Sequence, residues 1–156
     1  MTNFHHTQLA DHAEGVGYLD LVGFIIQNCP EAKEELEQLW RRMAFNILVS
    51  NTDDHMRNHG FILTEIGWRL SPACDMNPNE MGNVLTLNIS ENSNELDISL
   101  ALETARLYQL KNHKAESILK EIHQGISTWR TVAKKFGISN SEIEQTKRAF
   151  RLVEKG

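Results

Sequence analysis

In FNILVSNTDDHMRNHG, residues 45–60, an apolar helical segment runs directly into a polar cluster. Apolar residues recur at helical spacing from Ala32 to Leu48 with charged residues between them, which predicts one long amphipathic helix that ends at this cluster. An earlier apolar segment starts at Tyr18 and should end before Pro30, because proline blocks continuation of a helix. The polar cluster therefore follows two predicted helices.

Downstream of the cluster the sequence pattern changes to that of a β-hairpin. Residues 60–64 and 68–70 favour strands, and Gly67 lies in the turn expected between them. The hairpin leads directly to SPACD, residues 71–75, and so should deliver Asp75 to the polar cluster.

The remaining segments complete a mainly helical domain. At 156 residues, with 40% apolar and 24% charged residues, the chain fits one globular domain over residues 1–156, a helical bundle with a small β-hairpin at the site. The other expected elements are a lead-in loop in residues 1–17, a strand in 84–89, helices in 100–108, 113–126 and 127–136, and a last helix from an N-cap at 139–141 to Val153.

Charge is unevenly distributed along the chain, whose formal net charge is -5. Residues 1–128 carry 9 Lys and Arg against 18 Asp and Glu, whereas residues 129–156 carry 7 against 3. Proteins that grip phosphate backbones need an excess of Lys and Arg, so only the basic tail could contact nucleic acid. Residues 129–143 have a helix, turn, helix pattern, but such a pair is more often a structural hairpin, and the acidic remainder disfavours direct DNA contact.

The cysteines and the lengths of the apolar runs indicate the cellular compartment of the protein. Cys29 and Cys74 show neither metal-type spacing nor a disulfide framework, which fits a reducing compartment. No apolar run reaches membrane-spanning length, and the first residues do not form a signal peptide. We therefore expect a cytoplasmic protein without membrane contact.

Three oxygen-bearing side chains carry the predicted chemistry: Asp53, Asn58 and Asp75. Carboxylate and amide oxygens suit Mg²⁺, and a carboxylate beside a hydroxyl can orient it and take its proton during phosphoryl transfer. The alternative is that the residues around Asn51 and Asp53 only cap and turn the chain between helix and hairpin. Spacing alone leaves both interpretations open.

Two metal-based alternatives use the same loop. His55 and His59 are four residues apart, and on a helix they could bind zinc with Asp53 or Asp54 as a third ligand. Gly60 would break such a helix, and no Glu is placed as in a zinc protease motif, so a role without zinc is favoured. A metal-dependent phosphohydrolase that uses the His and Asp residues is the other alternative.

Residues 45–61 and 68–78 closely resemble the C-terminal part of HipA-like serine/threonine kinases. This resemblance covers most of the chain, because residues 18–20, 96–97 and 101–105 also look like that family. It implies the C-terminal lobe of a HipA-like kinase as the fold. The site roles that it implies are a catalytic base for Asp53, magnesium and nucleotide binding for Asn58 and Asp75, and nucleotide contact for His55 and Arg57.

The resemblance also implies a reaction and partners. The reaction is transfer of phosphate from Mg-ATP to a protein hydroxyl by the toxin of a toxin–antitoxin module, with Mg²⁺ and ATP as cofactors. The implied partners are a protein substrate such as an aminoacyl-tRNA synthetase and an antitoxin of HipB type. The family's N-terminal lobe, with its phosphate loop, nucleotide lysine and regulatory serine, has no counterpart in these residues, so we expect activity to require that lobe, whether it belongs to the same protein or is a separate chain. The alternative is a non-catalytic lobe remnant that binds an antitoxin, a companion lobe or DNA.

Overall fold

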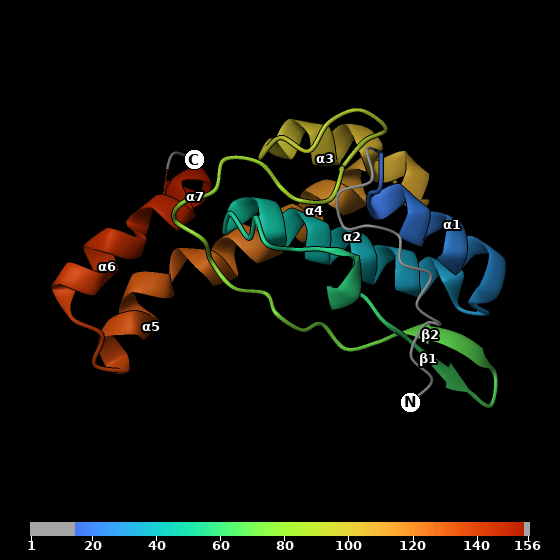
Figure 1. Cartoon of the computed structure of the whole chain (residues 1–156), viewed down its shortest axis with the longest axis horizontal. Coiled ribbons are helices and arrows are strands. Elements are labelled where there is room, and N and C mark those ends of the chain that lie inside the picture. Colours follow the sequence, from blue (N-terminus) through green and yellow to red (C-terminus); the bar gives the residue numbers. More distant parts are fainter. Residues whose placement is uncertain (1–14, 155–156) are drawn as a thin grey trace.

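The computed structural model describes residues 15–154, and helices dominate this part of the chain (Figure 1). The expected mainly α fold with one small hairpin is confirmed. The elements are α1 (Tyr18–Asn28), α2 (Ala32–Leu48), η1 (Met56–Asn58), β1 (Phe61–Thr64), β2 (Gly67–Leu70), α3 (Ile98–Thr104), η2 (Ala105–Tyr108), α4 (Asn112–Ser127), α5 (Trp129–Lys135), α6 (Asn140–Thr146), η3 (Lys147–Phe150) and α7 (Arg151–Glu154).

The central element is α2, which packs against α1, α3, α4, α7 and the hairpin (Figure 1). Its apolar stripe is fully buried and includes Leu36, Trp40, Met43 and Ile47. Trp40 also donates a hydrogen bond from Nε1 to the carbonyl of Ala101 at 3.0 Å, which ties α3 to α2. The other helices therefore pack on the apolar face of α2, which is the face that the amphipathic pattern of the sequence predicts.

The core has two parts. The larger one joins α1, α2, α3 and α4 with the hairpin, and a smaller one lies where α2 ends near the C-terminal helices. In the smaller part Phe150 stacks on Trp129 with ring centroids 4.2 Å apart, and both pack near Leu48 and Val49. The loop that follows α2 therefore leaves from a point held by the C-terminal segment.

The hairpin is antiparallel, with Phe61 opposite Leu70 and Thr64 opposite Gly67. Gly67 begins β2 with a φ of 129°, and a Cβ placed there would lie 2.7 Å from the ring of Pro30. Only glycine meets both demands. The hairpin is also joined to α2 by the buried carboxylate of Glu35, which accepts from Leu70 N at 3.2 Å.

Residues 84–89 do not form the predicted strand. Two isolated bridges, Gly17 with Asn88 and Val84 with Glu95, replace a ladder there. Leu85, Leu87 and Ile89 are buried, so the alternation in the sequence reflects side chains that face the core, but within residues 15–154 the segment has no partner strand.

The C-terminal prediction holds in part. Ser139 caps α6, accepting from Glu142 N at 3.3 Å while the Glu142 carboxylate returns to Ser139 N at 3.0 Å. The expected single helix to Val153 is instead divided into α6, η3 and α7. Most of the lead-in expected for residues 1–17 lies outside the described residues, and none of the described helices has the length and apolarity needed to span a bilayer.

Candidate active site

The candidate site is a loop that starts where α2 ends and runs through η1 to β1. Ser50 takes a left-handed conformation with a φ of 54°, which turns the chain away from the helix axis. Its hydroxyl donates to the Ala149 carbonyl at 2.9 Å and accepts from Arg151 Nη1 at 3.0 Å. The C-terminal segment thus fixes the point at which the site loop begins.

One side of this loop is buried and organised around Asp54. The hydroxyl of Tyr18 on α1 donates to Asp54, and the Nε2 atom of His59 lies 3.0 Å from both carboxylate oxygens. Asn46 of α2 donates from Nδ2 to the Tyr18 hydroxyl at 3.1 Å. Burial, with a smaller contribution from the charge of Asp54, raises the pKa of Tyr18 well above its usual value. This network joins α1 and α2 to the middle and the far end of the loop.

Asn51 connects the loop to the segment that carries Asp75. Its Nδ2 atom donates to Asn46 Oδ1 and to the carbonyl of Asp75, each at 3.1 Å. The backbone N–H of Asn51 donates to the Asn46 carbonyl at 2.8 Å. The side chain is buried, so these bonds are shielded from water and hold the two segments in one place.

The other side of the loop brings together the three residues that carry the predicted chemistry. Asn58 donates from Nδ2 to the Asp53 carbonyl at 3.4 Å, and its own carbonyl accepts from the thiol of Cys74 at 3.2 Å. Asp75 has a φ of 54°, and its Oδ1 accepts from Asn77 at 2.7 Å. Asp53 and Asp75 are exposed while Asn58 is buried. The side chains of Asn58 and Cys74 therefore link Asp53, Asn58 and the segment that carries Asp75 through hydrogen bonds.

The two further predicted residues lie on the same loop. His55 precedes η1 and is partly buried, and its Nδ1 atom has no hydrogen-bond partner in the described part of the chain. Arg57 lies within η1 and is exposed.

The donor set suits a hard cation. Asn58 uses its amide nitrogen on the Asp53 carbonyl, and within residues 15–154 no hydrogen bond engages its amide oxygen. Asp75 presents an exposed carboxylate on the neighbouring segment. Oxygen donors of this kind fit magnesium, which takes few protein ligands and leaves the rest to phosphates and water.

The premise of the zinc alternative is wrong. His55 and His59 lie before and after the short η1 rather than on one helical face, and His59 is taken up by Asp54. Among residues 15–154, no group of three His, Cys, Asp or Glu side chains is placed to hold a metal ion.

Sequence reasoning did not find Tyr18 or Asn46 as parts of the site, and it gave Asn51 only as a residue that could cap or turn the chain. The one available signal was Asn46, a polar residue on the apolar face of a predicted helix, because such residues are buried only with partners.

The family model of the HipA-like C-terminal domain matches residues 1–147. No curated protein matches the chain.

Proposed function

The chain belongs to the family of HipA-like C-terminal domains, a kinase-related region, and on that premise we propose that it is the catalytic lobe of a serine/threonine protein kinase. The reaction is transfer of phosphate from Mg-ATP to a protein hydroxyl. The observation that carries the proposal is the hydrogen-bonded link between Asp53, Asn58 and the Asp75 segment, with two carboxylates left exposed.

Each of these residues has a separate role in the proposal. Asp53 orients the attacking hydroxyl and takes its proton as the oxygen bonds to the γ-phosphorus and ADP leaves. Asn58 and Asp75 hold magnesium, which neutralises charge on the phosphate oxygens when it is bound with ATP. His55 and Arg57 line the nucleotide site.

A companion lobe, a protein substrate and an antitoxin are proposed from the same family membership. Phosphoryl transfer needs positioning and charge neutralisation from both sides of the nucleotide, so a companion N-terminal lobe completes the enzyme. The proposed substrate is a protein, with aminoacyl-tRNA synthetases as first candidates, and an antitoxin of HipB type restrains the toxin in the cytoplasm.

The test is phosphate transfer in the enzyme reconstituted with its companion lobe. Asp53→Asn should reduce kcat by at least about a hundredfold, because it removes a general base, and should leave nucleotide affinity nearly unchanged. Glu116→Gln, which removes one exposed negative charge from α4, is the matched control and should keep full activity. If transfer by Asp53→Asn equals that of the wild type, the base is elsewhere, and a non-catalytic interaction module becomes the better account.

A further inference from the structure

Residues 79–86 lie against Thr52, the residue that precedes the proposed catalytic base. Asn79 donates from Nδ2 to the Thr52 hydroxyl at 2.8 Å, and Thr86 donates from its own hydroxyl to the Thr52 carbonyl at 2.7 Å. Between them Gly82 approaches Thr52 so closely that a Cβ placed on it would lie 2.0 Å from the Thr52 Oγ1 atom. Thr52 is therefore held at its side chain and at its carbonyl by one segment.

One arginine of α7 joins this segment to the start of the site loop. Arg151 donates from Nη2 to the Gly82 carbonyl at 3.2 Å and from Nη1 to the Ser50 hydroxyl at 3.0 Å. Its Nη1 atom also donates to the Arg148 carbonyl at 3.0 Å. All three acceptors are neutral oxygens, so Arg151 contributes directed hydrogen bonds here rather than an ion pair. Because a planar guanidinium makes such bonds in fixed directions, Arg151 sets the position of Gly82 relative to Ser50.

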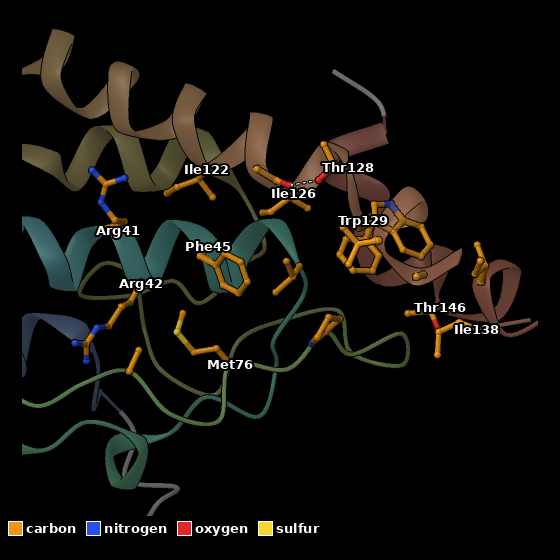
Figure 2. Close-up of a pocket in the computed structure, with 18 of the residues that line it drawn as sticks. Arg41, Arg42, Phe45, Met76, Ile122, Ile126, Thr128, Trp129, Ile138 and Thr146 are labelled. Carbon is orange, nitrogen blue, oxygen red and sulfur yellow. Dashed lines mark hydrogen bonds between the residues drawn. The ribbon is translucent and has the colours of Figure 1, made fainter. Parts of the chain in front are cut away.

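The segment that carries Arg151 is itself packed against the helical bundle. The ring of neighbouring Phe150 stacks on Trp129 with centroids 4.2 Å apart. Figure 2 shows Trp129 beside Ile126 at the end of α4, and both pack in the smaller part of the core. Arg151 therefore connects the site loop to a well-packed part of the fold.

The direction of the proposed base depends on this connection. The carboxylate of Asp53 is exposed and makes no hydrogen bond or ion pair within residues 15–154, so its position follows that of the backbone at Thr52 and Asp53. A general base acts only within hydrogen-bond reach of the proton that it takes. An error of about 1 Å in such a position can cost about a hundredfold in rate. A contact that fixes Thr52 therefore matters for the reaction although it touches no reacting atom.

We propose that Arg151 is a positioning residue: it holds residues 79–86 against Thr52 and so fixes the direction of the Asp53 carboxylate. The catalytic part of this inference rests on the proposed function, whereas the restraint on residues 79–86 is a property of the fold alone. Arg151 lies outside residues 1–147, the part of the chain that the family model matches.

The restraint on the base is separate from the restraint on the proposed metal ligand. Asn51 holds Asp75 through its carbonyl at 3.1 Å, and the three hydrogen bonds of Arg151 go to other residues. Loss of Arg151 should therefore impair proton transfer at Asp53 and leave the affinity for magnesium nucleotide intact.

Hydrogen exchange of the full chain without ATP, followed by mass spectrometry, tests the restraint. The amide of Asn79 donates to the Val49 carbonyl at 3.4 Å, so its exchange reports on the contact between the two segments. Arg151→Met keeps the apolar stem and removes the donors, and it should raise exchange at residues 79–86 by about tenfold, the equivalent of about one hydrogen bond. Arg106→Met makes the same change at an exposed arginine of η2 and should leave this exchange unchanged.

The effect on the reaction is measured in the enzyme reconstituted with its companion lobe. Arg151→Met should lower kcat by about tenfold and leave the affinity for Mg-ATP unchanged, and Arg151→Lys, which keeps a single donor group, should recover part of the loss. Gly82→Ala should also lower kcat, because its methyl group displaces residues 79–86 from Thr52. Gly125→Ala on α4 is the matched control, since a Cβ there meets nothing within 4 Å.

Two results would overturn the proposal. One is equal exchange at residues 79–86 in Arg151→Met and Arg106→Met, and the other is a kcat of Arg151→Met that equals the wild type or falls only together with the affinity for Mg-ATP. Circular dichroism establishes that each variant is folded, and Arg151→Lys takes the place of Arg151→Met in both comparisons if the methionine variant does not fold. A wild type that transfers no phosphate would overturn the proposed function and the catalytic part of this inference, while the exchange rates would still decide whether Arg151 holds the segment.

Discussion

Asp53 and Asp54 are neighbours in the chain, yet they belong to opposite sides of the site loop. The carboxylate of Asp53 is exposed and makes no hydrogen bond or ion pair within residues 15–154, whereas that of Asp54 is buried against Tyr18 and His59. The carboxylate of Asp54 thus holds the loop to the helices, whereas the carboxylate of Asp53 is accessible to a ligand. Two residues of identical chemistry have different surroundings because, in the described part of the chain, only Asp54 is enclosed by partners.

The buried side explains how the exposed side can be held in place. Tyr18 comes from α1 and Asn46 from α2, so the loop is bonded to the two helices that form the core of the domain. Asn51 extends the same network to the Asp75 carbonyl. Sites are precise when packed elements and hydrogen bonds restrain the loops that carry them. If this division is correct, changes on the two sides should have different consequences.

The largest effect on stability is expected for Asp54→Ala. It leaves the Tyr18 hydroxyl and the His59 ring buried without their acceptor, and such a loss costs about 3–5 kcal/mol. Urea unfolding followed by circular dichroism measures this directly. Asp53→Ala is the matched control, and its free energy of unfolding should stay within about 0.5 kcal/mol of the wild type. Equal losses in the two variants would remove the distinction between the sides.

Asn51→Ala should have the next largest effect, because it breaks the connection between the sides. The variant leaves the Asn46 amide oxygen and the Asp75 carbonyl without this donor, at a cost of about 1–3 kcal/mol in unfolding free energy. Nucleotide affinity should fall as well, since Asp75 loses a restraint. A variant that is destabilised but binds Mg-ATP as tightly as the wild type would show that the two sides work independently.

Tyr18→Phe should cost about 1 kcal/mol near neutral pH and change the response to alkali. The folded state holds the pKa of Tyr18 well above the unfolded value of about 10, so its contribution is full below about pH 10 and is lost as pH rises further. The unfolding free energy of the wild type should therefore fall above about pH 10, and that of Tyr18→Phe should fall less steeply. Some slope remains, because burial also raises the pKa of Tyr108. Parallel curves would contradict a buried, protonated Tyr18.

The sequence predicts local structure well where one physical signal dominates. Proline limits α1 at its C-terminal end, periodicity defines α2, and Gly67 marks the hairpin. The segment 84–89 misleads because burial of alternate side chains is a local pattern, whereas a strand needs a neighbour that the sequence does not reveal.

The site, like the fold, could be predicted from the sequence only in part. The resemblance of residues 45–61 and 68–78 to HipA-like kinases singles out Asp53, Asn58 and Asp75, and the structure links their segments. One partner of Asp54, Tyr18, lies 36 residues away on α1, so composition cannot tell which of the two aspartates is buried. Long-range hydrogen bonds of this kind become visible only once the helices are packed.

We propose that the exposed side of the loop binds magnesium nucleotide. Calorimetric titration of the chain with ATP, with and without magnesium, tests it most directly when wild type, Asp75→Asn and the charge-matched control Glu116→Gln are compared. We expect magnesium-dependent binding in the wild type and the control, and loss of that dependence in Asp75→Asn without loss of folding. Binding that ignores magnesium, or that is unchanged in Asp75→Asn, would contradict it.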